Sequence, residues 1–514
     1  MKAKKSAGQK KLIGLGLDSA TLSILSPLVE KGYLPTFKKI MEEGIYGALE
    51  STVPPITPCA WETAVTGVNA GKHNIFDFFS YTSDYGVEVL NSTDRSSLAV
   101  WDFLGFAKKK TIVFNYPMGY PPKKIEGIFV SGMNTPGVNT NFTYPASIKK
   151  EILQVAPSYK IDVLGDHIIN GKEDLYFDDI VRLTLDHAKA VKYLLRKYPW
   201  DLSLIFLTQL DRVHHYFYHH IDKSHPLYDN KKKKNRIEEY YVVLDKILED
   251  LLKSFRNFSF FIFSDHGTEA LYNDVFIEKY LEEWKLLSFK KNYAGYLTKY
   301  FTESILIGRK LAYKLGLAQY VQRILPGNIF TFLAQTSGIE GKELHIEWSN
   351  TKVYFPTPSS QGLRVNLVGR EEKGAVKEKD YNKIRNYVIN KLLNLKDPNT
   401  GEKIIKRVYR REEIYSGPYV ENAQDLIVET KSGYHLQKGI KKGKIGLASE
   451  GGVPKSAEHG RDGMFIYYHD KLKKRNSKVE KMQILDIAPS LLYILGLPAP
   501  KTMEGKIRKD IFDR

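Results

Sequence analysis

The chain has 514 residues, of which 42% are hydrophobic and 12% aromatic, and a single cysteine, Cys59. This composition excludes a disordered chain and a small disulfide scaffold, and one thiol excludes cysteine-based zinc ribbons and iron–sulfur clusters. The net charge of +18 fits an acidic partner, but the excess lysines lie in short patches with little aromatic interleaving, which favours a solvated basic surface and makes nucleic-acid binding an unlikely role.

The first residues, MKAKKSAGQKKLIGLGLDSA, are similar to a signal peptide in their basic start and apolar stretch. Asp18 interrupts that stretch, and no small-residue cleavage site follows it. No uninterrupted apolar run of 18 or more residues occurs elsewhere in the sequence. We therefore expect a cytoplasmic protein without a transmembrane segment.

Three short apolar runs share one design, since each ends in an aspartate: KLIGLGLD at Asp18, LSLIFLTQLD at Asp211 and FSFFIFSDHG at Asp265, with His266 next. Such runs are typical of strands buried on both faces of a parallel sheet. The amphipathic segments 34–43 and 237–254 predict crossover helices. The pattern predicts an α/β fold, a three-layer sandwich around a central, mostly parallel sheet. The three aspartates would meet in the crevice beyond the strand ends, although each alone could be a helix N-cap.

Thr57 lies between the first and second of these runs and directly precedes Pro58. Proline excludes a central strand position for this pair and predicts a strand-to-helix turn. A hydroxyl at a helix N-terminus lies where the helix dipole and free amides favour a developing anion. The sequence leaves open whether Thr57 is a nucleophile or only caps the helix.

A histidine-rich stretch, DRVHHYFYHH, begins at Asp211. If a helix begins near Asp211, His215 lies one turn on along the same face, and the two side chains could hold one metal ion. His214 would then point elsewhere, and the participation of His219 stays open. An ordinary packing or surface role for these histidines is the alternative.

Two further histidines precede glycines. Asp265 and His266 are adjacent, and adjacent residues serve one ion only where the backbone turns sharply, as Gly267 would allow. His459 precedes Gly460 in AEHGRDG and is by itself a weaker candidate ligand.

The stretch from Tyr272 to Ile346 breaks the α/β rhythm with helix-like basic and aromatic segments. We expect residues 1–271 to form the first part of the α/β core, 272–346 an inserted helical cap, and 347–514 the second part of the core. Apolar residues at helical spacing in the cap favour a packed core, with peripheral membrane contact as the alternative.

The order of these residues resembles the alkaline phosphatase superfamily, and within it the type I phosphodiesterase and nucleotide pyrophosphatase family. The matching positions are Asp18, Thr57 with Thr66-Gly67 nine residues on, Asp211, His215, Asp265, His266 and His459. Supporting phrases are LPTFKKIMEEGIYGALESTVPP, TGVNAGKH and DIAPSLLYILGLPAP. The resemblance covers the chain outside the cap.

The resemblance implies an alkaline phosphatase-like fold and a hydrolase with two divalent metal ions, with zinc expected and manganese as the alternative. One ion would be held by Asp18, Asp265 and His266 and would contact Thr57. The other ion would be held by Asp211, His215 and His459. Thr57 would be the catalytic nucleophile, forming a covalent phosphothreonine with a small-molecule phosphoester. The sequence predicts no particular oligomeric state.

Two positions near Thr57 depart from the family. Nucleotide pyrophosphatases carry an asparagine three residues after the nucleophile, where this chain has Ala60, and superfamily phosphomonoesterases use an arginine, where this helix start offers Trp61. We expect Ala60 and Trp61 to form an apolar wall suited to a second ester group, which predicts a preference for phosphodiesters over phosphomonoesters. Lys72 and Asn69 are candidates for the missing phosphate contact. Sulfatases carry a C-x-P-x-R pattern, and Cys59 is followed by Ala60, Trp61 and Glu62, so a sulfatase is disfavoured.

The sequence therefore favours a metal-dependent phosphodiesterase or nucleotide pyrophosphatase. A phosphoryl-transfer mutase or a phosphonate hydrolase of the same superfamily is the alternative. A non-catalytic protein that binds anionic ligands is a remote alternative, because Thr57 and the predicted metal ligands are all intact.

Overall fold

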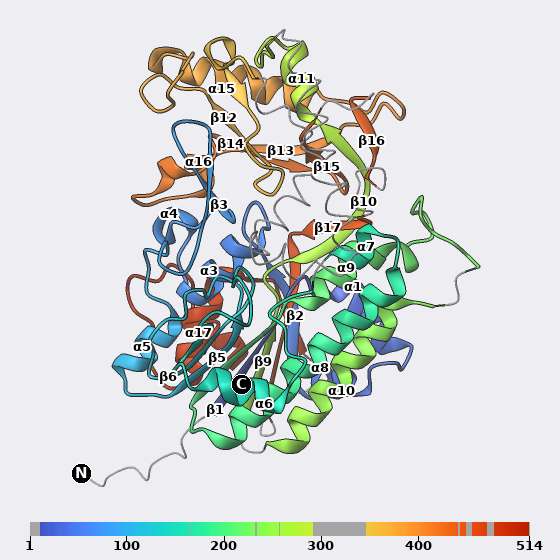
Figure 1. Cartoon of the computed structure of the whole chain (residues 1–514), viewed down its shortest axis with the longest axis vertical. Helices are drawn as coiled ribbons and strands as arrows, with labels where there is room; N and C mark the ends of the chain where they lie inside the picture. Colours follow the sequence, from blue (N-terminus) through green and yellow to red (C-terminus); the bar gives the residue numbers. More distant parts are fainter. Residues whose placement is uncertain are drawn as a thin grey trace.

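The computed structural model describes residues 11–163, 165–231, 234–255, 258–290, 346–439, 443–448, 455–469 and 477–512. They form two lobes (Figure 1). The core lobe contains the ten-stranded main sheet, and the second lobe, defined here as residues 277–290 and 346–439, lies above it in Figure 1. No helix within the described ranges is long and apolar enough to cross a membrane.

The main sheet has the strand order β19-β2-β18-β9-β1-β8-β5-β6-β7, with β20 paired to β2. Its central strands β9, β1, β8, β5 and β6 are parallel, and the three predicted apolar runs form the neighbours β9, β1 and β8. The strand bounds are β1 (Lys11–Leu17), β2 (Ile45–Glu50), β5 (Thr111–Tyr116), β6 (Gly127–Ser131), β7 (Thr143–Tyr144), β8 (Leu202–Leu207), β9 (Phe258–Phe263), β18 (Asp462–His469), β19 (Ser477–Lys478) and β20 (Met482–Gln483).

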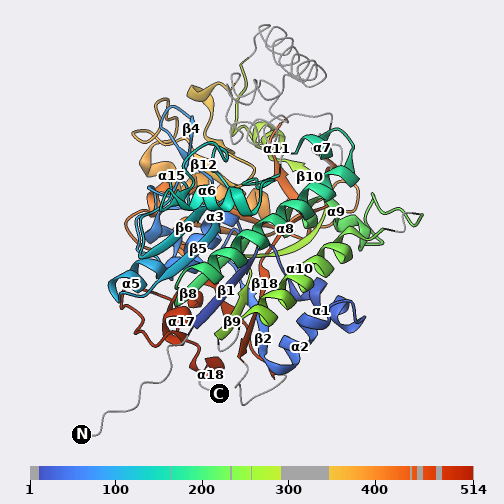
Figure 2. The same cartoon turned by 60° about the horizontal axis from the view of Figure 1, so that its bottom comes forward.

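Helices cover both faces of this sheet (Figure 2). One face carries α1 (Leu22–Glu30), α2 (Pro35–Glu43), α6 (Ile148–Val155), α8 (Glu173–Lys197), α9 (Gln209–Phe217) and α10 (Arg236–Ser254). The other face carries α3 (Thr57–Thr66), α5 (Val100–Phe106) and α17 (Ile487–Ile494). Shorter helices are α4 (Ala70–His73), α7 (Asp166–Ile169) and α18 (Lys509–Phe512). The predicted three-layer α/β sandwich is confirmed.

Gly16 in β1 allows α3 to pack closely on the sheet. A Cβ atom at Gly16 would lie 2.6 Å from Cη2 of Trp61. The Trp61 ring is fully buried, with its centroid 4.9 Å from that of Phe206 and 5.7 Å from that of Phe263. The helix that begins at Thr57 is thereby held against the strands that end in the predicted aspartates.

The second lobe has a sheet of its own, in the order β11-β12-β14-β13. Its elements are α11 (Ile277–Glu283), β11 (Val353–Tyr354), β12 (Gly362–Val365), α15 (Glu378–Leu393), β13 (Ile405–Arg410), α16 (Arg411–Ile414) and β14 (Leu426–Thr430). A further sheet joins the lobes through β10 (Gly267–Phe276), β15 (Gly433–Gln437), β16 (Ile445–Leu447) and β17 (Ala457–Gly460). The hairpin β3 (Phe79–Tyr81) and β4 (Val87–Val89) also reaches the second lobe, where Tyr85 stacks on Trp348 with ring centroids 3.6 Å apart.

The predicted division at residues 272 and 346 does not follow these sheets. Residues 291–345 of the predicted cap lie outside the described ranges, and its described part, including α11, packs with β11 and α15 in one apolar cluster. The strands between Val353 and Thr430, expected in the core, belong to the sheet of the second lobe. Short apolar strands look the same in a sequence whichever sheet they join, so the local pattern cannot place this boundary.

Candidate active site

Neighbouring strand ends bring most of the predicted site residues together. Asp18 follows β1, Asp211 lies in the first turn of α9 directly after β8, and Asp265 follows β9. Because β9, β1 and β8 are adjacent and parallel, their carboxyl ends meet at one edge of the sheet. The pairing of β10 with β17 adds His459, which lies opposite Thr268.

Asp18, Asp265 and His266 form the first group of side chains, together with Thr57. Nε2 of His266 lies 3.4 Å from Oδ1 of Asp18, 3.2 Å from Oδ2 of Asp265 and 3.2 Å from the Thr57 hydroxyl oxygen. The three ligand-type side chains are fully buried, and Thr57 is only 3% exposed.

Asp211, His215 and His459 form the second group. Nε2 of His215 lies 3.3 Å from Oδ1 of Asp211 and 3.1 Å from Nε2 of His459, which is 3.5 Å from the same carboxylate oxygen. The His459 ring stacks on that of His266, with centroids 3.9 Å apart, so the two groups adjoin. The structure thus places all seven predicted site residues in one cluster.

Each of the three histidines in the cluster uses its other ring nitrogen on a main-chain carbonyl. The Nδ1 atoms of His215, His266 and His459 donate to the carbonyl oxygens of Ala457, Gly267 and Pro55, at 2.7, 2.9 and 2.9 Å. A carbonyl can only accept, so each Nδ1 carries a proton, and each Nε2 presents a lone pair to the cluster whenever its ring is neutral. Histidines that bind metals are commonly oriented in this way.

The charges of the cluster fit divalent cations. Burial, reinforced by Asp265, raises the pKa of Asp18 well above its usual range, and burial raises the pKa of Asp265 to about 8. Neither carboxylate oxygen of Asp18, nor Oδ2 of Asp265, has a hydrogen-bond partner within the described part of the chain. Burial also lowers the pKa of His215 to about 4, which keeps that ring neutral. Burial opposes the charged form of His459 too, but a hydrogen bond and the charge of Asp211 outweigh it and raise the pKa of His459. Buried carboxylates without partners, beside imidazoles that a cation would replace as the positive charge, are a suitable donor set for zinc or manganese.

Asp211 differs from the other two aspartates in its surroundings. Burial opposes its ionisation, but His215 and His459 together hold its pKa well below the usual range. Asp211 is therefore more acidic than Asp18 and Asp265.

The structure excludes one of the two roles left open for Thr57, that of the helix N-cap. Thr57 is the first residue of α3, and the N-cap residue is Ile56, which makes no side-chain capping hydrogen bond. The Thr57 hydroxyl faces Nε2 of His266 instead of the helix amides. The first amides of a helix have no partners inside it, so the start of α3 favours an anion beside this hydroxyl.

The neighbouring histidines do not join the cluster. His214 points away, as expected, and its Nδ1 lies 2.7 Å from the Ser19 hydroxyl. The main-chain N–H of His219 donates to the Ser456 hydroxyl, and His219 belongs to none of the metal-type groups in the described residues.

A glycine is required at position 267 for a different reason than the sharp backbone turn that the sequence suggested. It does not adopt a left-handed conformation, but a Cβ atom there would lie 2.1 Å from the carbonyl oxygen of Asp462. Close approach to β18 therefore requires this glycine.

The expectation that Ala60 and Trp61 form an apolar wall for a second ester group is wrong. Ala60 and Trp61 are both fully buried in the apolar layer between α3 and the sheet. One turn beyond Thr57, these side chains point into the core behind it and not into the crevice. The residues three and four positions after the nucleophile therefore cannot line a substrate site.

The two candidates for the missing phosphate contact are engaged elsewhere. The Lys72 ammonium pairs with Glu504 at 2.8 Å. The Asn69 side chain accepts from the Gly71 amide at the start of α4 and donates to Glu504. Neither residue reaches the cluster around Thr57.

Glu458 is a member of the cluster that sequence reasoning missed. One of its carboxylate oxygens lies within 4.8 Å of ring nitrogens of His215 and His459. The only signal in the sequence is its position next to His459 in AEHG.

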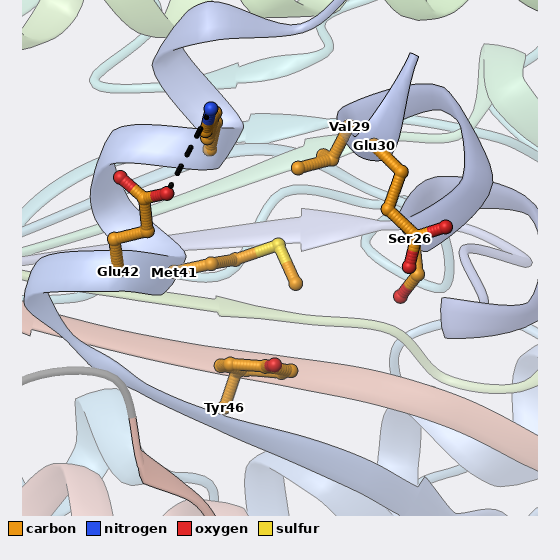
Figure 3. Close-up of a pocket in the computed structure, with 7 residues that line it drawn as sticks. Ser26, Val29, Glu30, Met41, Glu42 and Tyr46 are labelled. Atoms are coloured by element: carbon orange, nitrogen blue, oxygen red, sulfur yellow. Dashed lines mark ion pairs between the residues drawn. The ribbon is translucent and has the colours of Figure 1, made fainter. Parts of the chain in front are cut away.

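A pocket of about 340 Å³ lies elsewhere, against α1, α2 and β2 (Figure 3). Its lining residues are Ser26, Val29, Glu30, Lys38, Met41, Glu42 and Tyr46. It contains none of the cluster residues.

Comparison with known proteins agrees with this arrangement. The profile of a family described as type I phosphodiesterase / nucleotide pyrophosphatase matches residues 12–464. A search of curated proteins gives no match to the chain.

Solved structures share the fold at low sequence identity. Murine ectonucleotide pyrophosphatase / phosphodiesterase 5 aligns with a TM-score of 0.53 and 12% identity, over 98% of this chain and 100% of that chain. An inactive threonine-to-alanine form of that murine protein, in complex with AMP, aligns at 0.53 and 11%, over 98% and 99%. Phosphonoacetate hydrolase from Sinorhizobium meliloti 1021, in complex with phosphonoformate, aligns at 0.56 and 13%, over 96% of each chain. These likenesses confirm an alkaline phosphatase-like fold.

Proposed function

The chain belongs to the type I phosphodiesterase / nucleotide pyrophosphatase family, and from this premise we propose that it is a metal-dependent hydrolase of small-molecule phosphodiesters or nucleotide pyrophosphates that acts through a covalent phosphothreonine at Thr57. The observation that carries the proposal is the set of three Nε2 lone pairs that face buried carboxylates beside the Thr57 hydroxyl.

Two divalent ions, zinc or manganese, would be bound by the two groups of side chains. Asp18, Asp265 and His266 would hold the ion next to Thr57. Asp211, His215 and His459 would hold the other. When bound, such ions stabilise charge on phosphoryl oxygens and lower the pKa of a hydroxyl or a water molecule.

Thr57 provides the nucleophile. Its Oγ loses its proton and forms a bond to phosphorus while the ester or anhydride bond to the leaving group breaks. The leaving oxygen takes the bonding electrons and a proton, and the other ester group stays on the phosphorylated threonine. The amides at the start of α3 face the charge that develops on the phosphoryl oxygens. Water then cleaves the phosphothreonine and returns the free hydroxyl. The murine relative, in which a threonine-to-alanine form is inactive, supports this role.

The charges around the cluster support a preference for diesters. A monoester brings a further negative charge, which needs an additional cation in the transition state. In the described part of the chain, two cations beside the cluster are already paired: Arg212 with Asp162 at 3.0 Å and with Asp211 at 3.8 Å, and Lys455 with Glu458 at 2.8 Å. We expect kcat/KM for bis(p-nitrophenyl) phosphate to exceed that for p-nitrophenyl phosphate, and a monoester preference would contradict the assignment.

The test of the mechanism combines metal removal with variants of α3. Stripping the ions should abolish diester hydrolysis, and added zinc or manganese should restore it. Thr57→Ala should bind the ions but lose turnover, and acid-quenched parent enzyme should carry on Thr57 the phosphoryl group with its remaining ester substituent, detectable by mass spectrometry. Thr63→Ala, a buried threonine of the same helix, serves as the control and should stay active. Full activity of Thr57→Ala would assign the attack to water.

A phosphonate hydrolase is the second candidate, favoured by the likeness to phosphonoacetate hydrolase. The same cluster could stabilise cleavage of a carbon–phosphorus bond. Phosphate release from phosphonoacetate, compared with nucleoside monophosphate release from a dinucleotide, separates the two activities.

A further inference from the structure

Glu458 extends the second group of the cluster beyond the predicted ligands. It precedes His459 on β17, and neighbouring residues of a strand ordinarily point to opposite faces. Nevertheless one Glu458 oxygen lies within 4.8 Å of ring nitrogens of both His215 and His459. Ligand atoms about 2.0–2.2 Å from one zinc ion are separated by up to about 4 Å, so a small side-chain adjustment would complete this set.

Lys455 holds the Glu458 carboxylate in this position. Its ammonium lies 2.8 Å from Oε1 of Glu458, and the side chains of Lys455 and Glu458 are 31% and 16% exposed. The next residue, Ser456, is anchored to the same histidine, because its N–H donates to the carbonyl oxygen of His215 at 2.6 Å. A carboxylate has about four lone-pair directions, so one ammonium competes with an ion for this carboxylate but does not exclude it.

A neighbouring histidine does not compete for this carboxylate. Nε2 of His435, on β15, lies 3.9 Å from Oε1 of Glu458. That nitrogen accepts a hydrogen bond from the Gln361 amide at 3.0 Å, so it carries no proton to donate to Glu458. Lys455 is therefore the cation that neutralises Glu458 in the protein without metal.

The balance of charge gives Glu458 a role. The first group offers two carboxylates, from Asp18 and Asp265, to one divalent ion. The second group, without Glu458, offers only the carboxylate of Asp211. Adding Glu458 gives the second ion two carboxylates as well, and buried ions are stable only where their charge is matched.

We propose that Glu458 is a fourth protein ligand of the second ion and that Lys455 holds its carboxylate beside the site until the ion binds. This inference rests on the proposed function, which assigns that ion to Asp211, His215 and His459.

The experiment measures zinc binding to the full-length, metal-stripped protein by competition with a chromophoric chelator. Glu458→Gln should weaken the binding of one ion by about 10- to 100-fold and leave the other unchanged. Lys455→Met should tighten the same ion several-fold, because the ammonium competes for the carboxylate and repels the cation. Glu269→Gln is the matched control, since Glu269 pairs with Glu458 across the strands but is exposed and outside the metal-type groups.

The size of the Glu458→Gln effect distinguishes a ligand from a charge that only lies near the site: loss of a ligand should weaken zinc binding at least about 10-fold, and a change of only a few-fold would overturn the inference. If Lys455 and Glu458 only stabilise the strand, the two variants break the same bridge and should affect zinc binding alike, which would overturn the inference. Unchanged binding of both ions by folded Glu458→Gln would also overturn it. If Glu458→Gln does not fold, as judged by circular dichroism, Lys455→Met decides, and weaker or unchanged zinc binding overturns the inference. A parent protein that binds no zinc would instead contradict the proposed function.

Discussion

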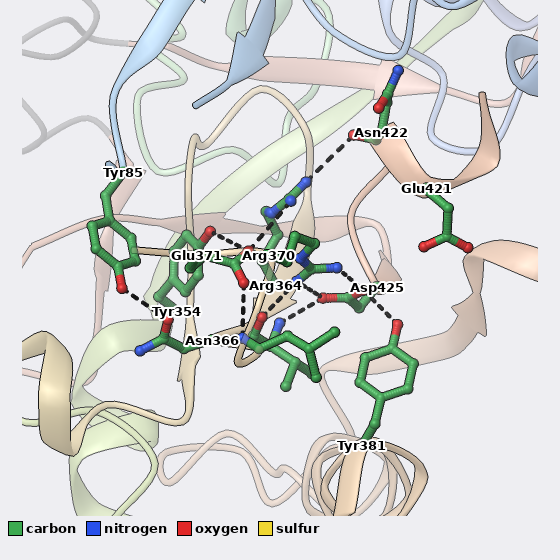
Figure 4. Close-up of polar contacts among 12 residues, drawn as sticks. Tyr85, Tyr354, Arg364, Asn366, Arg370, Glu371, Tyr381, Glu421, Asn422 and Asp425 are labelled. Carbon is green, nitrogen blue, oxygen red and sulfur yellow. Dashed lines mark hydrogen bonds and ion pairs between the residues drawn. The ribbon is translucent and has the colours of Figure 1, made fainter. Parts of the chain in front are cut away.

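The second lobe and the candidate active site bury carboxylates in opposite ways. In the second lobe, the fully buried Asp425 receives two hydrogen bonds from the guanidinium of Arg370, at 2.8 and 2.7 Å, one from the Val365 amide at 2.6 Å, and one from the Tyr381 hydroxyl (Figure 4). In the core lobe, Asp18 is equally buried, but neither of its oxygens has a hydrogen-bond partner in the described ranges.

The difference appears in the acidity of the two groups. Burial raises the pKa of Asp18 well above its usual range, with Asp265 adding to the effect. Burial opposes ionisation of Asp425 too, but hydrogen bonds and charge from Arg370 outweigh it and lower the pKa of Asp425. This chain can therefore supply an internal cation to a buried carboxylate, as it does for Asp425 and, through Arg212 at 3.8 Å, for Asp211. In the described residues, no lysine or arginine forms an ion pair with Asp18 or Asp265 at the neighbouring strand ends. The paired carboxylate has a structural role, and the unpaired ones fit a role that needs a cation from solution.

The largest expected effect is on catalytic activity, which should depend on Asp18 and not on Asp425. Asp18→Asn should lower kcat/KM for a diester by about 1000-fold, because a lost metal contact removes several kcal/mol of transition-state stabilisation. Asp425→Asn, compared per folded molecule, should stay within a few-fold of the parent. Equal losses in both variants would break the comparison.

The free energy of unfolding should depend on Asp425 more than on Asp18, which is the opposite of the order expected for activity. Asp425→Asn should lower the free energy of unfolding by about 2 kcal/mol, since it removes the buried carboxylate that Arg370 and Arg411 share. It leaves each guanidinium with one carboxylate partner, Glu371 or Glu421. The measurement is urea unfolding followed by circular dichroism. A loss below about 1 kcal/mol would show that this network is not structural.

Asp18→Asn should stabilise the metal-stripped protein by about 1–2 kcal/mol. Because burial raises the pKa of Asp18, the folded protein near neutral pH must either keep this carboxyl group protonated or ionise it in a buried site, and the amide avoids that cost. The amide cannot replace the carboxylate toward an ion. Urea unfolding with and without zinc tests both halves of this statement. A variant less stable than the parent without zinc would mean that Asp18 has a structural partner.

The pH dependence should sharpen the contrast in the second lobe. The pKa of Asp425 is lower in the folded than in the unfolded protein, so its contribution to stability is fully present above its unfolded pKa, about 3.9, and is lost as the pH falls through its folded pKa. The stability difference between the parent and Asp425→Asn should therefore be constant from about pH 7 to pH 5 and shrink below about pH 4. Urea unfolding at stepwise lower pH measures it, and a difference that grows in acid would contradict the assignment.

The smallest effect is expected at Lys72. Its pair with Glu504 is partly exposed, with 38% and 27% of the two side chains accessible, so Lys72→Ala should cost less than about 1 kcal/mol. Diester and monoester turnover should both stay within about two-fold of the parent. A selective loss of monoester turnover would place Lys72 at the substrate after all.

Much of the core lobe could be predicted from short stretches of the chain. The strands β1, β8 and β9 are continuous apolar runs, which identify buried parallel strands, and the aspartates that follow them identify the strand-end edge. The helix start at Thr57 was marked by Pro58. The second lobe was not separated from the core, because short strands such as β12 and β14 carry no sign of the sheet that they join.

Side-chain direction was predicted less well. Ala60 and Trp61 lie one turn beyond Thr57, but the space that β1 leaves at Gly16 takes the Trp61 ring into the core. The sequence shows that these residues follow Thr57 on the same helix. Their burial depends on β1, a strand of the adjacent layer, and so could not be predicted from the helix alone.

The sequence by itself determined the fold class and the order of the candidate ligands along the chain, because strand burial and helix starts follow from local patterns of apolar, glycine and proline residues. Only the tertiary structure decided which ring nitrogens face the cluster and that Lys72 forms an ion pair with Glu504. It also decided that Glu458 and Lys455 lie beside the second group of side chains. Most of these contacts join segments far apart in the chain, and the exception, Glu458 beside His459, depends on how β17 is placed against α9. Their geometry comes from packed layers and not from any repeating pattern along the sequence.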